Sequence, residues 1–164
     1  MTSRLRRLAL LVLTLTAVAV AIPAASAASA ASAQSQIPVL TGIRTGRHAD
    51  FDRVVLDLAG PRPEFFVRSV AQLHYDGSGL PVPLPGAYFL EVRLAPAAAH
   101  DDLGNRTYPG PDQFDTPALT NVQAVAVTGD FEANLTVGLG SRRDSWHRVF
   151  LLDSPTRVVI DVGH

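Results

Sequence analysis

The sequence predicts an all-β fold, a two-sheet antiparallel β-sandwich of about eight or nine short strands. Apolar and polar residues alternate with period two along residues 39–162, and no segment there keeps the apolar spacing of an amphipathic helix. Glycine and proline clusters interrupt this alternation where turns would join the strands. Strands with one apolar face suit antiparallel sheets whose polar faces stay in water. An opened barrel is the alternative.

The expected strands follow one another with short breaks. In residues 53–58 the even-numbered residues are apolar and share one face, while the odd-numbered residues include an arginine and an aspartate. Residues 88–94, 134–139 and 157–162 repeat this pattern. In chain order, the segments that we expect to form strands are residues 39–45, 53–58, 65–70, 72–75, 88–94, 122–127, 134–139, 148–152 and 157–162.

Two connections differ from ordinary tight turns. Residues 80–86 are rich in proline and should be extended. Residues 95–119 look like one long connection, with a short helical turn at residues 97–101. Connections of this length are uncommon in compact domains and are often functional.

Residues 1–33 have the three parts of a secretory signal peptide. Three arginines precede an uncharged apolar stretch at residues 8–22, and small residues recur at alternate positions in residues 25–33. A membrane anchor is the rival interpretation, but this stretch is shorter than the roughly 20 residues that span a bilayer. We expect cleavage near residues 28–34, no membrane span afterwards, a secreted or cell-envelope location, and one domain over residues 34–164.

The composition excludes several kinds of site and partner. The 164-residue chain has no cysteine, so it forms neither a disulfide nor a thiolate metal site. All 14 basic residues are arginines, against 15 acidic residues. Without the three arginines of residues 1–7 the formal charge is −4, which argues against a nucleic-acid partner and against charge-driven membrane binding.

The sequence contains an internal echo. Residues 52–58 read DRVVLDL and residues 156–162 read TRVVIDV, so both contain an R-V-V-x-D segment. One interpretation is a generic half-buried strand whose arginine and aspartate form cross-strand ion pairs on a solvated face. The other is an ancestral duplication that gives two related sheets.

A short series of polar residues in an expected loop is a candidate ligand site. His48, Asp50 and Asp52 form an H-x-D-x-D pattern between Arg47 and Arg53. These side chains could coordinate a hard cation, which needs around six oxygen ligands, or hydrogen-bond a sugar. A polar turn that pairs its charges locally is the alternative.

A second polar segment echoes this loop. Asp130 and Phe131 lie in residues 129–132, which read GDFE and are similar to the ADFD of residues 49–52. If a site has to be chosen, the echo favours residues 47–53 together with residues 129–131. We therefore expect the two segments to lie at one end of the sandwich.

Aromatic residues in or next to loops are further candidates. Their rings can stack on the C–H faces of sugars, or they can cap the ends of the core. These residues are Tyr75, Tyr108, Phe114, Phe131 and Trp146. Arg142 and Arg143, near Trp146, could meet the carboxylates of a peptide or wall polymer, or form a solvated pair on a hairpin.

The catalytic motifs that we sought are absent from the sequence. It has no G-x-S-x-G elbow, no S-x-x-K, no H-E-x-x-H and no phosphate-binding glycine loop. His100, Asp101 and Asp102 are adjacent in the long connection, but neighbouring aspartates on an extended chain do not face one another. We expect no catalytic residues, no metal and no cofactor, and hence no enzyme.

Several segments carry a family resemblance. In order they are LTGIRTGRHADFDRVVLDLAG, DGSGLPVPLPGAYFLEVRLAPAAAHD, TYPGP, GDFEANLTVGLG and TRVVIDV, which cover most of residues 40–162. In these segments the chain resembles the AMIN-like domain of exported actinobacterial proteins. That family is named for the AMIN domain, a peptidoglycan-binding β-sandwich appended to periplasmic amidases and secretins. The chain has no lipobox cysteine, which many relatives carry, and we expect it to act without an attached catalytic domain.

The resemblance implies a secreted, non-catalytic cell-envelope module that binds peptidoglycan or another cell-wall glycan or peptide. The alternative is a protein–protein adaptor that recruits or regulates an envelope hydrolase, for which an exposed apolar patch or a free sheet edge is expected. A small hydrolase with loop carboxylates is a third hypothesis, and it requires two converged carboxylates in a concave site.

Overall fold

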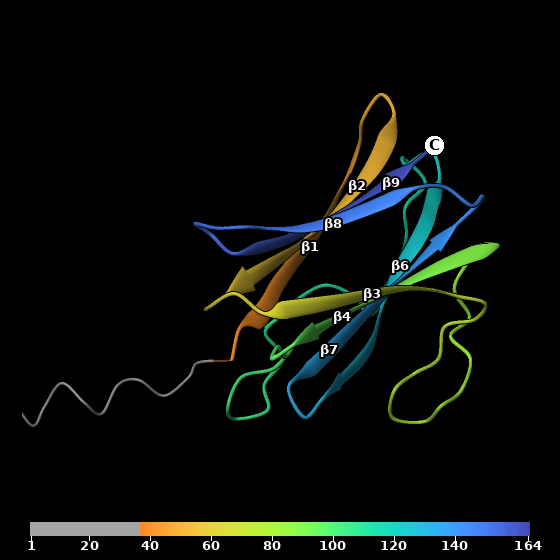
Figure 1. Cartoon of the computed structure of the whole chain (residues 1–164). Helices are drawn as coiled ribbons and strands as arrows, with labels where there is room; N and C mark the ends of the chain where they lie inside the picture. The colour runs from red at the N-terminus through yellow and green to blue at the C-terminus, as the bar shows by residue number, and fades with distance from the viewer. Residues whose placement is uncertain (1–36) are drawn as a thin grey trace, which may run out of the picture. The chain divides into compact units, whose positions relative to one another are not determined.

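The computed structural model describes residues 37–164, and the predicted signal segment lies outside them. These residues form two antiparallel sheets, which confirms the predicted all-β sandwich (Figure 1). The four-stranded sheet has the order β1-β2-β9-β8 and the five-stranded sheet the order β3-β4-β7-β6-β5. The strands are β1 (Val39–Arg47), β2 (Phe51–Ala59), β3 (Glu64–Val70), β4 (Tyr88–Ala95), β5 (Gln113–Asp115), β6 (Val122–Phe131), β7 (Asn134–Ser141), β8 (His147–Leu152) and β9 (Arg157–Gly163).

The main core lies between the two sheets. Along β2 every second residue is buried and the residues between are half-buried, as the alternation of the sequence predicts. Both sheets contribute large buried side chains, among them Leu40, Leu56, Leu94, Leu135, Leu139 and Ile160. Each sheet therefore turns one apolar face toward this core, and its other face lies outside the core.

A second, smaller core covers the outer face of the five-stranded sheet. The loop between β3 and β4, residues 71–87, packs there against β6. This core consists of Leu73, Val82, Leu84, Ala124 and Ala126. Glycines in β7 make room for the loop, because a Cβ at Gly138 would clash with Leu73 and one at Gly140 would clash with the carbonyl oxygen of Pro85. The loop therefore covers the β6 and β7 part of this outer face, whereas Phe66 and Arg68 on the same face of β3 remain exposed.

The outer face of the four-stranded sheet has no such cover within residues 37–164. Trp146, Arg148 and Leu152 on this face are exposed, and the outward residues of β2 are only half-buried. No loop of the described chain covers the outer face of this sheet, which is therefore open to solvent.

The long connection between β4 and β6 fills the side of the sandwich next to β1. Its residues Ala97, Ala99, Tyr108 and Leu119 are buried in the main core. The prediction of one structureless connection with a helical turn is wrong in two respects. Residues 113–115 form β5, which is too short for an alternation signal, and the backbone N–H groups of Ala97 and Ala98 bond to Ala133 and Pro38 instead of closing a helical turn.

One further predicted element differs. Residues 72–75 are not a strand; His74 makes only an isolated bridge to Pro81 within the loop that covers the five-stranded sheet. No helix in residues 37–164 has the length and hydrophobicity to cross a membrane.

A buried carboxylate joins the two sheets. Asp52, on the inner face of β2, is fully buried and accepts hydrogen bonds from the backbone N–H groups of Thr120 (3.0 Å), Asn121 (2.6 Å) and Val122 (3.0 Å). Because residues 120–122 lead into β6, this carboxylate attaches the start of β2 to the start of β6. Asp52 therefore has a structural role and is not accessible to a ligand.

Candidate functional site

The outer face of the four-stranded sheet carries a row of charged and aromatic side chains. Antiparallel pairing places Arg53 of β2 opposite Asp161 of β9, and Asp161 opposite Arg148 of β8. Phe51 and Phe150 are each two residues from an arginine of this row, so their rings lie on the same face. We call this surface the arginine–aromatic face and define it as Phe51, Arg53, Trp146, Arg148, Phe150 and Asp161.

Asp161 holds the two arginines in place. Its Oδ1 accepts a hydrogen bond from Nε of Arg53 at 2.7 Å, and its Oδ2 accepts one from Nη2 of Arg53 at 2.9 Å and one from Nη2 of Arg148 at 2.8 Å. The carboxylate is fully buried, whereas the side chains of Arg53 and Arg148 are 29% and 61% exposed. The negative charge is thus covered, and the two positive charges face solvent.

The electrostatics of this row follow from its geometry. Burial by itself raises the pKa of the Asp161 carboxyl, but hydrogen bonds and charges from Arg53 and Arg148 outweigh burial and keep that pKa below its ordinary value. The hydrogen bond to Asp161 in turn raises the pKa of Arg53. All three groups are therefore charged near neutral pH, and the row has a net charge of about +1.

Aromatic rings frame the arginines. The guanidinium carbon of Arg53 lies 5.2 Å from the ring centre of Phe51, and that of Arg148 lies 5.0 Å from Phe150. These are cation–π distances. The Phe51 and Trp146 rings are 6.1 Å apart at an angle of 58°, and Trp146 is 53% exposed. A Cβ at Gly163 would clash with the indole nitrogen of Trp146. The indole can therefore pack against β9 because residue 163 has no side chain.

This arrangement leaves hydrogen-bond donors for a ligand. Within the described part of the chain, Nη1 of Arg53 and Nε and Nη1 of Arg148 have no acceptor. Guanidinium groups held flat by a buried carboxylate suit recognition of carboxylates, and exposed aromatic rings suit packing against the C–H faces of sugars. The face therefore presents both free guanidinium donors and exposed aromatic rings to solvent.

The predicted loop of residues 47–53 contributes only partly to this face. Arg53 belongs to it, and the His48 ring stacks on Phe51 at 4.4 Å and so extends the aromatic frame. Arg47 and Asp50 are exposed at the same hairpin. The backbone carbonyl of Asp50 accepts a hydrogen bond from the N–H of His164.

The expectation that the two echoing loops share one end of the sandwich is wrong. Asp52 contacts residues 120–122 at the start of β6, whereas Asp130 and Phe131 lie at its other end. Eight residues along a strand, from Val122 to Asp130, correspond to roughly 26 Å. In Figure 1 the β1–β2 hairpin and the β6–β7 hairpin accordingly lie at opposite ends.

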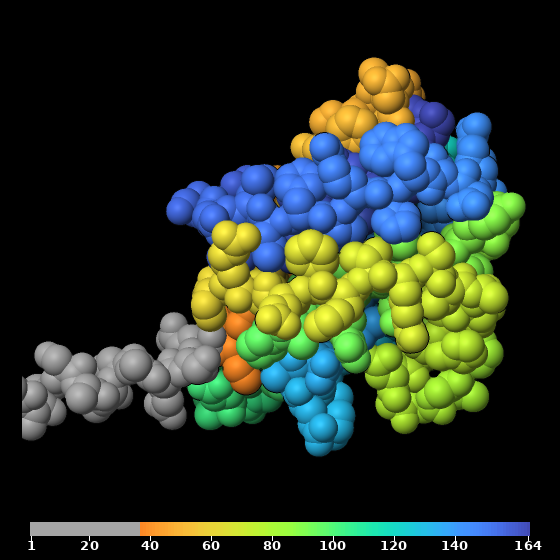
Figure 2. Space-filling model, in the orientation of Figure 1, coloured from red at the N-terminus to blue at the C-terminus, as the bar shows by residue number. Residues whose placement is uncertain are grey.

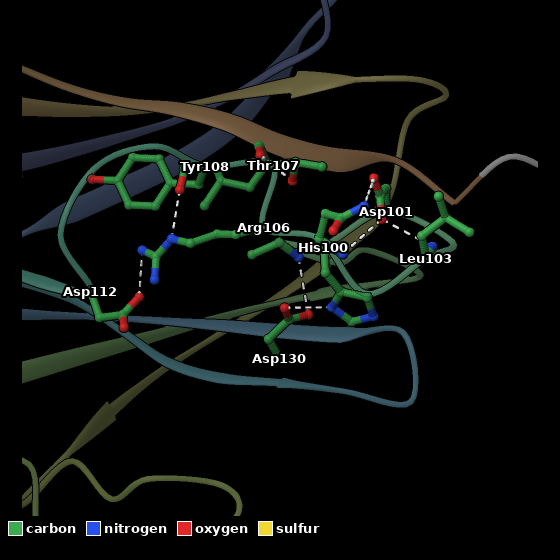
Figure 3. Close-up of polar contacts among 11 residues, drawn as sticks. His100, Asp101, Leu103, Arg106, Thr107, Tyr108, Asp112 and Asp130 are labelled. Carbon is green, nitrogen blue, oxygen red and sulfur yellow. Dashed lines mark hydrogen bonds and ion pairs between the residues drawn. The ribbon is translucent and has the colours of Figure 1, made fainter.

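Asp130 instead belongs to a separate polar cluster (Figure 3). Its Oδ2 lies 2.7 Å from Nδ1 of His100, and its Oδ1 accepts the backbone N–H of Ala99 at 3.0 Å. Nearby, Arg106 pairs with Asp112 at 2.7 Å and donates to the carbonyl oxygen of Tyr108. His100, Arg106, Asp112 and Asp130 border an open hollow of about 420 Å³.

The polar groups of this cluster mostly bind one another. Asp101, for example, accepts hydrogen bonds from the side-chain amide of Asn105 and from the backbone N–H groups of Asn105 and Leu103, and these bonds lower the pKa of its carboxyl. Within residues 37–164, no three histidine or acidic side chains, including those of Asp101 and Asp102, are arranged so that they could hold a metal ion. The hydrogen bonds of Asp130 to Ala99 and His100 thus hold the segment between β4 and β6 against the β6–β7 hairpin.

The remaining predicted residues fall in different places. Tyr108 is buried in the main core, so the core-cap alternative is correct for this ring and it offers no surface to a ligand. Tyr75 is half-buried against the second core, and Phe114 packs against the main core. Phe131 is exposed at the β6–β7 hairpin. Arg143 lines a cleft between the sheets, close in sequence to Trp146.

Sequence reasoning missed Arg148, Phe150 and Asp161 as members of the site. Two signals could have found them. The alternation of residues 148–152 places Arg148 and Phe150 on the solvent face. Antiparallel pairing of the two R-V-V-x-D segments brings the arginine of one copy opposite the aspartate of the other, and this is the pairing that β2 and β9 adopt.

Comparisons with known proteins give one match. A family model described as the AMIN-like domain matches residues 38–164, which is the whole sandwich apart from its first described residue. No curated protein and no solved structure matches the chain significantly.

Proposed function

The chain belongs to the AMIN-like domain family, and on this premise we propose that it is a secreted, non-catalytic module of the cell envelope. In this proposal it binds peptidoglycan or another cell-wall glycan through the arginine–aromatic face. The observation that carries the proposal is the row Arg53–Asp161–Arg148, which holds two guanidiniums in fixed positions on an uncovered sheet face.

The chemistry of the face suits such a polymer. Trp146 and Phe51 offer flat apolar surfaces for sugar rings, and the unpaired nitrogens of Arg148 can donate to carboxylates of the glycan or of its peptides. A protein with a formal charge of −4 after signal cleavage needs a local positive site to hold an anionic polymer. The two arginines supply it.

The same face favours a glycan binder over the adaptor alternative. A continuous apolar patch is one of the two features expected of an adaptor, and this face does not form one, because its aromatic rings alternate with charged groups. The non-catalytic part of the proposal is supported by the family and by the dispersal of the carboxylates, because Asp130, Asp161 and Asp101 each bind a different set of neighbours.

Sedimentation with insoluble peptidoglycan tests the proposal. We expect retention of the purified protein, and a loss of at least about tenfold in retention for Trp146→Ala and for Arg148→Gln. Arg68→Gln is the matched control, since Arg68 is also an exposed sheet arginine paired with a carboxylate, Glu91, but on the other sheet. Retention no greater than that of an unrelated β-sandwich, or equal retention of the face variants and the control, contradicts the proposal.

The same samples test the absence of catalysis. We expect no soluble fragments to appear when the protein is incubated with peptidoglycan. Release of reducing sugar ends or of free amines that grows with incubation time contradicts the non-catalytic assignment.

A further inference from the structure

A small cleft opens between the two sheets at the side away from the long connection. It lies between β8 and the pair β3 and β4, and Figure 2 shows β3 (yellow) and β8 (blue) next to each other on this side. The cleft has a volume of about 70 Å³. This space exceeds what one water molecule needs, so a small apolar side chain fits in it.

The wall of the cleft is mostly apolar. Leu90 from the inner face of the five-stranded sheet and Val162 from that of the four-stranded sheet line it, and both are at least 94% buried. Val70 and Phe89 also border the cleft, but their side chains pack against the second core on the other face of the sheet. A methyl or isopropyl group placed here would be removed from water on contact with the edge of the main core.

The polar side of the cleft contains an arginine with free donors. Arg143 lines the cleft and is exposed, and no residue of the described chain accepts a hydrogen bond from its guanidinium. Its backbone is fixed, because its N–H donates to Oδ1 of Asn121 at 3.1 Å and its carbonyl accepts from Nδ2 of Asn121 at 3.4 Å. Asn121 is itself fully buried and donates to the carbonyl of Gly163. The arginine thus extends from a rigid backbone.

The charge balance of the cleft restricts the ligand further. Asp144 also lines it, so the side chains contribute one positive and one negative charge next to His147. One carboxylate can pair with Arg143, and Asp144 repels a dianion such as phosphate more strongly than it repels a single carboxylate. Tyr88 and Ser69 line the cleft as well, and both carry a hydroxyl group, which is a hydrogen-bond donor and acceptor.

From these observations we infer that the cleft binds the carboxyl end of a peptide whose last residue has a small apolar side chain. The terminal carboxylate pairs with Arg143, and the side chain enters the space above Leu90 and Val162. The inference rests on the proposed function only for the source of the peptide, since cell-wall polymers carry peptides beside their glycan. Trp146 is next in sequence to Ser145 and His147 of the cleft, so one polymer can reach both surfaces.

Titration of the purified protein with short peptides, followed by two-dimensional nuclear magnetic resonance, tests the inference. The probe is N-acetyl-alanyl-alanine in both chiral forms. We expect saturable shifts of the backbone signals of Ser69, Tyr88 and His147. The C-terminal amide of the same peptide should bind at least about tenfold more weakly, because it loses the charge-assisted hydrogen bond. N-acetyl-alanyl-phenylalanine should be weakened similarly, and inorganic phosphate should cause no saturable shift.

Variants separate the role of Arg143 from general effects of charge. Arg143→Gln should lose at least about tenfold in affinity, and Arg143→Lys should recover part of it. Arg142→Gln is the control, because Arg142 is the neighbouring exposed arginine and does not line the cleft. Equal affinity of Arg143→Gln and the wild type, or equal affinity for the acid and the amide, overturns the inference.

Retention on peptidoglycan is measured in parallel. If wild-type protein is retained but does not bind the dipeptide, the inference about the cleft is overturned and the proposed function is not. Wild-type protein that binds the dipeptide but is not retained overturns the proposed function and supports the cleft.

Discussion

Arg53 and Asp161 face each other across β2 and β9 and are joined by two hydrogen bonds of 2.7 and 2.9 Å. They are the first residue of one R-V-V-x-D segment and the last residue of the other. Because the two segments run antiparallel, Val55 lies opposite Val159 and Asp57 lies opposite Arg157. The two copies are thus related by an approximate two-fold rotation between neighbouring strands of one sheet.

The two R-V-V-x-D segments differ in how their aspartates are paired, and this difference creates the arginine–aromatic face. Asp57 bonds to Arg44 of β1 at 2.6 and 2.7 Å instead of to Arg157, whose donors reach the carbonyl oxygens of Pro155 and Asp153. Asp161 by contrast receives a second arginine from β8. One aspartate thus belongs to a simple ion pair, while the other organises two guanidiniums.

The first prediction concerns the stability of this row. Asp161→Asn keeps the shape of the side chain but removes the negative charge between two arginines. We expect the free energy of unfolding to fall by about 1–3 kcal/mol, below the range for a fully buried broken pair because both arginines reach water. Urea unfolding measures it. Glu91→Gln, which breaks the more exposed pair with Arg68, should cost less than about 1 kcal/mol, and an equal cost for both contradicts the assigned role.

The second prediction is the pH dependence of that stabilisation. The pKa of Asp161 is lower in the folded protein than its ordinary value of 3.8, so the unfolded chain binds the proton more readily. The contribution is therefore fully present above that ordinary value and is lost as the pH falls through the lower, folded value. We expect the stability difference between wild type and Asp161→Asn to be constant from neutral pH to about pH 5 and to shrink below it. A difference that does not change in acid contradicts this.

The alternation of the sequence was sufficient to predict the sandwich, because most strands bury one face. It predicted a strand that includes Val54 and Leu56 and another that includes Val158 and Ile160, and all four residues are buried. The cross-strand interpretation of the echo is confirmed for Arg53 with Asp161. The interpretation of two related sheets is wrong, since both copies lie in the same sheet.

The site was less predictable, because its partners are far apart in the chain. Arg53 and Asp161 are separated by 108 residues, and His100 and Asp130 by 30. Local patterning says which face a side chain occupies, but it does not say which strands are neighbours. The burial of Tyr108 was unpredictable for the same reason, because it depends on a contact between distant segments. Its loop packs into the core beside β1, where the Thr107 hydroxyl donates a hydrogen bond to the carbonyl oxygen of Leu40.

The third prediction concerns the carboxylate between the sheets. Asp52→Asn replaces two acceptor oxygens by one and places an amide N–H₂ group against backbone donors. We expect a loss of about 2–4 kcal/mol in the free energy of unfolding, because a buried group that served three N–H donors leaves some of them unsatisfied. Asp50→Asn, at the exposed turn two residues earlier, should stay within about 0.5 kcal/mol of wild type. A similar small effect for both substitutions contradicts the role of Asp52.

The fourth prediction uses Trp146, the single tryptophan of the chain, as its own reporter. A Cβ at Gly163 would clash with the indole ring and with Ser145 Oγ, so Gly163→Ala should displace the ring from β9 into water. We expect the fluorescence maximum to move to longer wavelength and retention on peptidoglycan to fall, while urea unfolding stays cooperative. Gly46→Ala is the matched control in the same sheet, because a Cβ there meets no atom within 4 Å. If Gly163→Ala leaves the emission unchanged, the indole does not depend on this glycine for its place. If the emission moves but retention does not, the position of the ring matters for the fold and not for the ligand, and the sugar-stacking role of Trp146 is wrong.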